Sequence, residues 1–240
     1  MIEGYLNYLS SLNSDVIIWL NQFSQMSASF NKAVDYVQMS PLIKGIPSMG
    51  LLWYFWFRDV DNSGRTRRLI VAAIMGCLFA LIFARVLNNV ITHPRPIAMP
   101  LLHLQQLSGL TAIDLEDKFY LHSFPSDHAT MFFSLVTAIF LISRRAGIFA
   151  FAYVSILICL PRMYMGLHFP ADILGGALLG IFFVLLCTSQ PVSRLFQYPI
   201  RLLQTHPAAF QAALFMLSVE MCVMFDHVRP LVKRLFGDFG

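Results

Sequence analysis

The chain has 240 residues, of which 57% are hydrophobic and only 12% are charged, and its mean hydropathy is +0.65. A typical soluble domain has roughly 45–50% apolar and about 25% charged residues, so this composition excludes an ordinary soluble protein and indicates a membrane protein. The net charge of +4 comes from Lys and Arg residues in a few loops between apolar runs. Membrane topology explains that distribution better than a nucleic-acid partner does.

No linker, low-complexity tract or internal repeat divides the chain, so we expect one domain over residues 1–240. Four cysteines lie separately inside apolar runs and without metal-ligand spacing, at Cys77, Cys159, Cys187 and Cys222. They are interpreted as small core hydrophobes. The residues imply no metal and no cofactor.

Residues 1–40 are predicted to form an N-terminal interfacial segment and not a cleaved signal peptide. The first twenty residues lack a basic region, and polar positions interrupt them, as in YLNYLSSLNSD. Residues 5–38 instead indicate one or two short amphipathic helices. Their expected apolar side consists of Tyr5, Leu9, Leu12, Ile17 and Trp19.

Apolar windows in the rest of the chain predict an all-α, polytopic membrane helix bundle of about six transmembrane helices, because a bilayer-spanning helix needs about 20 mostly apolar residues. The first window is weakened by Lys44 and Pro47, and the last carries Glu220 and Asp226. We expect these two acidic side chains inside the bundle or near the interface. In chain order the windows are 41–57, 69–92, 126–143, 146–163, 171–189 and 208–226.

The basic residues predict the orientation of this bundle, since Lys and Arg are retained on the cytoplasmic side. The 57–68 loop carries four arginines, and the 144–145 turn and the 190–207 loop carry two each. All three fall on one side of the predicted bundle, which we expect to be cytoplasmic. The 93–125 loop and the 163–170 connection then face the exterior.

Gly176 and Gly180 form a GxxxG pair in the 171–189 window. Small residues at this spacing permit two helices to approach closely. An incidental pair of glycines is an equally good interpretation from the sequence alone.

Three polar segments interrupt the apolar runs on the predicted outer face, namely HPRP at 93–96, FPSDH at 124–128 and PRMYMGLHFPAD at 161–172. Each has a structural explanation. Prolines end helices, Ser126 before an apolar run is suited to be an N-cap, and the helix dipole favours Asp127 in the first turn.

Helix capping does not explain His128, because the dipole disfavours a cation at a helix start. A phosphate bound there by free N–H groups would stabilise protonated His128. Together the three segments supply two arginines for phosphoryl oxygens. They also supply two histidines, one to attack phosphorus and one to protonate the leaving oxygen, and a carboxylate to steady the attacking imidazole. This set predicts phosphoryl transfer without a metal.

The three segments resemble the signature motifs of the type 2 phosphatidic acid phosphatase superfamily, which read Lys-x6-Arg-Pro, Pro-Ser-Gly-His and Ser-Arg-x5-His-x3-Asp. Here the first motif ends in Arg95-Pro96, the second is PSDH, and the third has Arg162, His168 and Asp172 at the family spacing. The likeness covers residues 69–190. It implies that His168 is the nucleophile that forms a phosphohistidine and that Asp172 orients it. It further implies that His128 is the acid and later the base, and that the phosphoryl oxygens are held by Arg95, Arg162 and Ser126.

Two positions depart from the family pattern. Asn88 stands where the family has its lysine, and Asp127 stands where it usually has glycine. Both are included in the predicted phosphate-binding set. Arg85 lies one helical turn before Asn88, so it either reaches the site or turns to headgroups or an acidic partner. His93 is another candidate replacement for the lysine.

The resemblance implies an integral-membrane lipid phosphatase in the inner (plasma) membrane, with its active site facing the exterior or periplasm. PSDH resembles members that hydrolyse undecaprenyl pyrophosphate, so a polyprenyl pyrophosphate is the first expected substrate. The alternatives are phosphatidylglycerol phosphate or phosphatidic acid as substrate, and phosphotransfer onto a lipid such as lipid A. A non-catalytic transporter or lipid-binding protein is the alternative outside the enzyme class.

Overall fold

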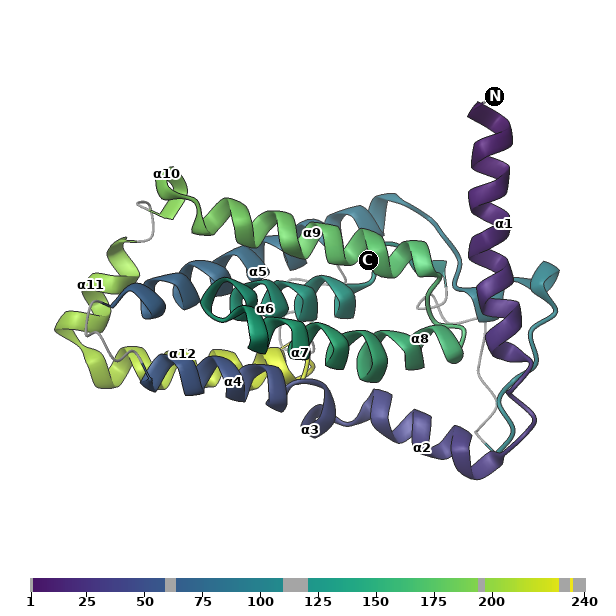
Figure 1. Ribbon diagram of the computed structural model, residues 1–240, viewed down its shortest axis with the longest axis horizontal. Coiled ribbons are helices and arrows are strands. Elements are labelled where there is room, and N and C mark those ends of the chain that lie inside the picture. The colour runs from purple at the N-terminus through teal and green to yellow at the C-terminus, as the bar shows by residue number, and fades with distance from the viewer. Residues whose placement is uncertain (1, 59–63, 110–120, 194–196, 229–233, 235–240) are drawn as a thin grey trace.

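The computed structural model describes residues 2–58, 64–109, 121–193, 197–228 and 234, and these are mostly helical (Figure 1). Within the described residues the only β pairing is an isolated bridge between His93 and His122. The predicted all-α fold is confirmed. The helices are α1 (Ile2–Asn21), α2 (Ala28–Met39), α3 (Pro41–Lys44), α4 (Ile46–Phe57), α5 (Arg65–Val90), η1 (Pro96–Ala98), η2 (Pro100–Leu102), α6 (Asp127–Ile142), α7 (Arg144–Val154), η4 (Ser155–Cys159), α8 (Leu160–Tyr164), α9 (Pro170–Thr188), α10 (Gln190–Ser193), α11 (Gln197–Thr205) and α12 (Pro207–Cys222).

Helix α6 lies in the middle of the bundle and packs mainly against α9 and α5. Buried apolar residues occur on every face of α6, as expected for a helix that has no polar stripe facing solvent. Phe132, Leu135 and Ile139 are among its fully buried side chains. The four cysteines of the chain are all buried in the structure, which confirms their interpretation as core residues.

The GxxxG pair of α9 lies where this helix approaches α6. A Cβ atom at Gly176 would come within 2.5 Å of the Ser126 carbonyl oxygen, and one at Gly180 would meet the Thr130 carbonyl oxygen even more closely. No side chain fits at either position without moving backbone. The predicted close helix approach is therefore confirmed.

Among the described residues, three helical stretches have the length and composition to cross a membrane, namely Arg65–Val90, Arg144–Tyr164 and Pro170–Thr188. The helices Asp127–Ile142 and Pro207–Cys222 are apolar but shorter. The first predicted window, 41–57, is divided between α3 and α4, because Pro47 in the first turn of α4 has no N–H to continue a helix from α3. The count of six spanning helices is not confirmed.

The stretch Arg144–Tyr164 is not a uniform α-helix. Residues Ser155–Cys159 form one π-helical turn between α7 and α8, and the chain continues in helical conformation on both sides. The predicted 146–163 helix thus exists with this interruption. Tyr153, just before the turn, donates a hydrogen bond to the Ile43 carbonyl at 2.7 Å.

The two ends of the bundle differ in chemistry. The three polar segments lie at one end, where α5 ends and α6 and α9 begin, and we call this the motif end (Figure 1). The described arginines of the three basic loops lie at the other end; Arg194 is outside the described residues. They are Arg58, Arg65, Arg67, Arg68, Arg144, Arg145 and Arg201.

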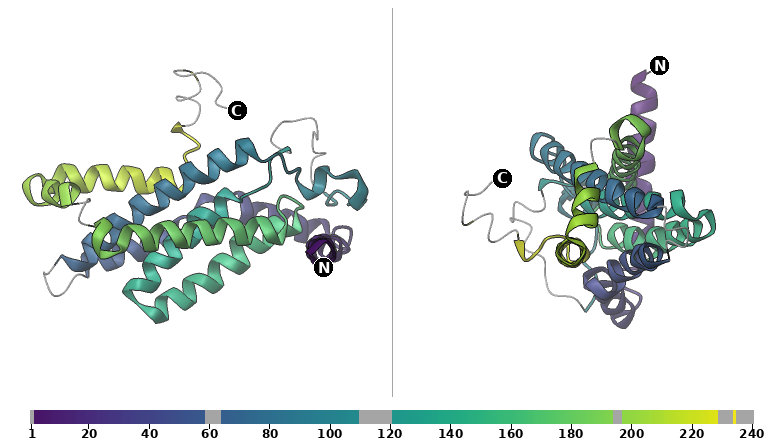
Figure 2. Two further views of the ribbon diagram at one scale, coloured as in Figure 1. Left: turned by 90° about the horizontal axis from the view of Figure 1, so that it is seen from above. Right: turned by 90° about the vertical axis from the view of Figure 1, so that its left-hand side faces the viewer.

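Helix α1 runs across the bundle axis at the motif end, as the two perpendicular views agree (Figure 2). The predicted N-terminal helices are confirmed, but their apolar residues do not share one face. Ile17 is 1% exposed and packs inward, whereas Trp19 is 57% exposed. The side chains of Tyr5 and Leu9 lie outside the described part.

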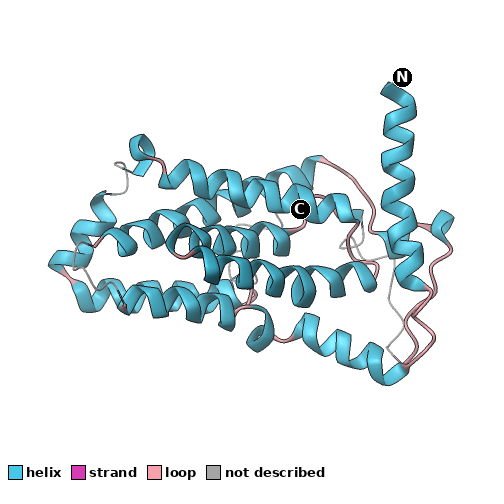
Figure 3. Ribbon diagram, viewed as in Figure 1, coloured by secondary structure: helices cyan, strands magenta, loops and turns pink. Residues whose placement is uncertain are grey.

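Buried Asn31 ties α2 into the motif end. Its Nδ2 donates to the Ser24 carbonyl at 2.7 Å and the Ser108 carbonyl at 3.0 Å, and its Oδ1 accepts from the Tyr164 hydroxyl at 2.6 Å. Because a buried polar group is costly unless bonded, this residue fixes α2 against α8 and the loop after η2. Figure 3 shows that loops join the described helices.

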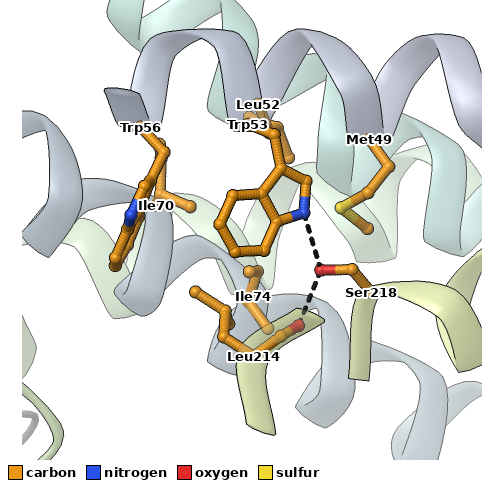
Figure 4. A pocket seen from close by; sticks show the side chains of 8 residues that line it. All are labelled: Met49, Leu52, Trp53, Trp56, Ile70, Ile74, Leu214 and Ser218. Atoms are coloured by element: carbon orange, nitrogen blue, oxygen red, sulfur yellow. Dashed lines mark hydrogen bonds between the residues drawn. The ribbon is translucent and has the colours of Figure 1, made fainter. Parts of the chain in front are cut away.

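An apolar pocket lies between α4, α5 and α12, away from the polar segments (Figure 4). Its one polar contact is a hydrogen bond from Trp53 Nε1 to Ser218 Oγ at 3.2 Å, and Ser218 in turn donates to the Leu214 carbonyl at 2.7 Å. Trp56 Nε1, which also lines the pocket, is buried and has no hydrogen-bond partner among the described residues. The pocket contains no residue of the predicted site.

Candidate active site

Backbone hydrogen bonds join the three polar segments at the motif end. The Ser123 N–H donates to the His93 carbonyl at 2.7 Å, and the Ser126 N–H donates to the Asp172 carbonyl at 3.1 Å. A third bond runs from the Ile97 N–H to the Gly166 carbonyl at 2.9 Å. Residues far apart in the sequence therefore meet at one place through main-chain contacts.

His168 is buried, and its hydrogen bonds fix the tautomer of its ring. Nδ1 lies 3.0 Å from the Ser123 carbonyl oxygen, which can only accept a hydrogen bond. Nδ1 must therefore carry the proton, and Nε2 has the free electron pair. Arg95 Nη1 lies 3.2 Å from Nε2 and can donate to it. The ring thus presents its nucleophilic nitrogen to a guanidinium.

Burial keeps His168 neutral. It lowers the pKa of His168 from 6.5 to about 4, and the nearby carboxylate of Asp172 opposes this only in part, while Arg95 and Arg162 add to the lowering. At neutral pH the imidazole is unprotonated at Nε2. A neutral imidazole is the form that can attack phosphorus.

The carboxylate of Asp172 reaches His168 through Ser123. Its Oδ2 accepts hydrogen bonds from Ser123 Oγ at 2.5 Å and from the Phe169 N–H at 2.7 Å. The same oxygen lies 3.8 Å from His168 Nδ1, which is too far for a hydrogen bond. Ser123, which the sequence motifs did not include, supplies both the carbonyl that holds His168 and the hydroxyl that holds Asp172.

Both predicted arginines are buried at the site. Arg95 Nη1 donates to the Leu167 carbonyl at 2.7 Å in addition to its contact with His168. Arg162 Nη1 donates to Gln38 Oε1 at 3.3 Å, and the buried Arg162 Nε has no hydrogen-bond partner among the described residues. A buried, unpartnered donor of a guanidinium is costly and favours an anionic ligand.

The predicted cap at the start of α6 is confirmed. Ser126 is the N-cap, and its side chain accepts from the Ala129 N–H at 3.4 Å. Asp127 and His128 are the first two residues of the helix, and the His128 ring lies 6.3 Å from that of Phe132. The bond from Ser126 to Asp172 places this helix start, and with it His128, next to the third segment.

The two departures from the family pattern have contacts of their own. Asn88 is buried and its Nδ2 donates to the Phe124 carbonyl at 3.2 Å, so its amide N–H holds the FPSDH segment. Arg85 Nη2 lies 2.7 Å from Asp127 Oδ2, which selects the acidic partner among the alternatives for this arginine. The role of Asn88 as a phosphate ligand stays a prediction.

His93 lies beside Asp172. Its Nδ1 is 3.7 Å from Asp172 Oδ1, and its ring packs edge-on against Phe169 at 5.4 Å. Within the described part of the chain, no three His, Cys, Asp or Glu side chains group as metal ligands do.

Sequence reasoning missed the contribution of the N-terminal helices. Gln38 in α2 binds Arg162, and Asn13 Oδ1 in α1 accepts from the Ala171 N–H at the start of α9 at 3.0 Å. The sequence offered only the presence of polar residues such as Asn13 and Gln38 in segments expected to be interfacial. No sequence pattern identifies partners that are more than a hundred positions away.

Comparison with known proteins identifies the family. A model of the PAP2 superfamily matches residues 69–195, which is more than half of the chain and includes all three polar segments. The chain belongs to the PAP2 superfamily. This confirms the resemblance seen in the motifs.

Two curated proteins are similar to this PAP2 member. "Bacitracin transport permease protein BcrC" of Bacillus licheniformis is 25% identical over 172 residues, which cover 72% of this chain and 77% of that protein. "Putative undecaprenyl-diphosphatase YbjG" of Escherichia coli strain K12 is 25% identical over 171 residues, which cover 68% of this chain and 77% of that protein. The comparison with solved structures found no significant match.

Proposed function

We propose that this PAP2 protein hydrolyses a polyprenyl pyrophosphate, such as undecaprenyl pyrophosphate, through a phosphohistidine on His168. The family and its relatives support a membrane lipid phosphatase. The observation that carries the proposal is the buried Arg162, whose Nε has no partner among the described residues, in the same site as Arg95 and neutral His168. This arrangement has the charge and shape for a phosphoryl group.

In the first half-reaction the Nε2 electron pair of His168 forms a bond to the terminal phosphorus. The bond between this phosphorus and the bridging oxygen breaks, and His128 gives its proton to the departing lipid phosphate. The carbonyl of Ser123 stabilises the imidazolium that forms, because it already accepts from Nδ1. Arg95, Arg162 and the helix start capped by Ser126 hold the phosphoryl oxygens.

In the second half-reaction water attacks the phosphohistidine. His128, now unprotonated, takes a proton from the water, and the phosphorus–nitrogen bond breaks to release inorganic phosphate. His168 returns to its neutral form with the proton on Nδ1. Each residue ends in the state in which it began, and no step calls for a metal.

The choice of a pyrophosphate rests on two observations. Asp127 gives this chain the PSDH form of the second motif, and the printed name of YbjG assigns that relative to undecaprenyl diphosphate. Phosphatidic acid, phosphatidylglycerol phosphate and transfer to a second lipid would use the same phosphoenzyme. These alternatives are therefore outcomes of the test described below.

We place the site on the exterior or periplasmic side of the inner (plasma) membrane. The motif end and the arginine-rich end are opposite ends of the bundle, and arginines are retained in the cytoplasm. The separation of the motif end from the arginine-rich end supports this orientation. A cysteine-accessibility measurement with introduced single cysteines at Gln105 and at Arg145 would test it, with the former expected to react from outside.

The decisive experiment measures phosphate release by the detergent-purified protein in excess EDTA. The substrates are a polyprenyl pyrophosphate, its monophosphate, phosphatidic acid and phosphatidylglycerol phosphate, and His168→Ala is the matched control. We expect fastest release from the pyrophosphate and inhibition by vanadate, which imitates pentavalent phosphorus. Loss of activity in EDTA with recovery on adding Mg²⁺ contradicts the histidine mechanism. Faster release from a glycerolipid contradicts the substrate.

A further inference from the structure

The ion pair between Arg85 and Asp127 joins two helices at the motif end. Arg85 Nη2 in α5 lies 2.7 Å from Asp127 Oδ2, at the first position of α6. The Arg85 side chain is 46% exposed and that of Asp127 is 20% exposed. Asp127 directly precedes His128, the residue proposed to protonate the leaving group.

The pair connects the two departures from the family motifs. The family places a lysine at position 88 and usually a glycine at position 127. Here Asn88 carries no charge and is bonded to the Phe124 carbonyl. The cation of α5 lies instead at Arg85, one helical turn earlier, and the added carboxylate of Asp127 holds it. Both departures from the family motifs therefore bear on the position and the partner of Arg85.

The contact is suited to exchange. The Arg85 side chain is 46% exposed, so its charge stays hydrated when it leaves the pair, and holding this long side chain in one position costs entropy. Asp127 offers one oxygen to Arg85, while its other oxygen, Oδ1, is buried and has no hydrogen-bond partner among the described residues. A phosphate dianion offers more charge and several acceptor oxygens, with which a guanidinium forms paired hydrogen bonds.

We propose that Arg85 binds the lipid-linked phosphate of a diphosphate substrate, and that Asp127 holds Arg85 at the site while no substrate is bound. This inference rests on the proposed function. When the bond between the terminal phosphorus and the bridging oxygen breaks, the electron pair stays with the lipid phosphate and His128 supplies its proton. Arg85 then stabilises the negative charge of this leaving group.

The proposal makes Arg85 selective for the leaving group. A phosphate monoester releases an alcohol, which carries no phosphate for Arg85 to bind. A diphosphate releases a lipid phosphate, which is still an anion after His128 has protonated it. The informative quantity is therefore the ratio of kcat/KM for a polyprenyl pyrophosphate to kcat/KM for the monophosphate of the same lipid.

Arg85→Gln should lower this ratio by about tenfold or more, the size of effect expected for one lost charge-assisted hydrogen bond. Arg85→Lys, which retains the charge, should lose less. Arg145→Gln is the matched control, since Arg145 is an exposed arginine at the opposite end of the bundle. Its ratio should equal that of the unmodified protein. Thermal unfolding in detergent verifies that each variant is folded.

Asp127→Asn separates substrate binding from a structural role. If the pair only joins α5 to α6, both partners contribute equally, and Asp127→Asn should lower the ratio as Arg85→Gln does. If Arg85 binds phosphate, Asp127→Asn releases it, and the ratio should stay the same or rise. An unchanged ratio in Arg85→Gln, or equal falls in both variants, overturns the proposal. Inactivity of the unmodified protein towards every lipid phosphate instead overturns the proposed function.

Discussion

The carbonyl oxygen of Ser123 lies 3.0 Å from His168 Nδ1, closer than the carboxylate of Asp172, which is 3.8 Å away. The hydroxyl of the same serine donates to Asp172 at 2.5 Å. One residue thus positions both the imidazole and the carboxylate. The negative charge of Asp172 acts on His168 through the orientation of this serine.

Ser123→Ala should lower kcat by about tenfold with a smaller effect on KM, because a hydrogen bond to a charged group contributes about 1.5–3 kcal/mol and this one holds the nucleophile's neighbour. Steady-state kinetics on the preferred lipid phosphate measures both constants. Ser134→Ala is the control, since Ser134 is also buried and donates to the Thr130 carbonyl within α6. An unchanged kcat in Ser123→Ala would show that the hydroxyl of this serine has no positioning role.

The two histidines should respond differently to the leaving group. His168→Ala removes the nucleophile, so hydrolysis and any acid-labile phosphoenzyme should disappear for every substrate. His128→Ala removes the acid, so an aryl phosphate, whose leaving anion is stable, should retain more activity than an alkyl phosphate. Chromogenic and lipid substrates compared side by side measure this. Rescue of His168→Ala by the aryl phosphate would exchange the assigned roles.

The burial of His168 predicts how activity depends on pH. Its pKa is lowered from 6.5 to about 4 by burial, so the proposed nucleophile stays unprotonated down to about pH 4. The acid limb of kcat/KM, which reports groups of the free enzyme, should therefore have its midpoint well below 6.5. A pH profile of kcat/KM checks this. A midpoint at 6.5 would mean that His168 is exposed to water.

The same shift affects stability in the opposite direction from a salt-bridged histidine. Between pH 6.5 and about 4, the unfolded chain binds a proton at position 168 and the folded chain does not. The contribution of His168 therefore destabilises the fold as pH falls through this window, and it levels off below about pH 4. Melting temperatures in detergent should fall less steeply with acid in His168→Gln. An identical slope in both proteins would contradict the burial of a neutral ring.

The contact of α9 with α6 should not tolerate a side chain. Gly176→Ala places a Cβ within 2.5 Å of the Ser126 carbonyl, so the helices must separate. The N-cap and the Ser126–Asp172 hydrogen bond should be disturbed with them. We expect a lower melting temperature and at least a tenfold loss of activity, since about 1.4 kcal/mol in a barrier changes a rate tenfold.

Gly50→Ala is the matched control for that experiment. Gly50 also lies within a helix, and nothing is within 4 Å of a Cβ added there. Because Ala is the better helix former, this substitution should preserve or raise the melting temperature. If both glycine variants behave alike, the close approach of α6 and α9 is not a constraint.

The sequence predicts the parts of this site that depend on local chemistry. Ser126 caps α6 because a serine before an apolar run satisfies the first N–H groups, and His168 stands four positions before Asp172, at the start of a helix. The bridging role of Ser123 and the Gln38–Arg162 bond depend on how distant segments fold together. Periodicity and spacing carry no information about such pairs.

The break between α3 and α4 at Gly45 and the inward packing of Ile17 both depend on tertiary packing. Gly45 lies against Cys222, where a Cβ atom would come within 2.5 Å of the Cys222 Cα, so tertiary packing adds to the effect of Pro47. Ile17 and Trp19 are two positions apart and therefore lie on different sides of one helix. Membrane sidedness and the substrate remain predictions of the sequence.

The π-helical turn at Ser155–Cys159 sets the direction in which Arg162 points. Tyr153 and Arg162 contact the same segment, through Ile43 and Gln38, although they are nine positions apart. Nine residues of a regular α-helix, at about 100° each, would put them on opposite sides, about 180° apart. The π turn absorbs one residue and reduces the difference to about 80°. The number of residues in this stretch, independent of their identity, thus determines whether Arg162 faces the candidate site. Deletion of one residue from 155–159 should turn it away while leaving every motif intact.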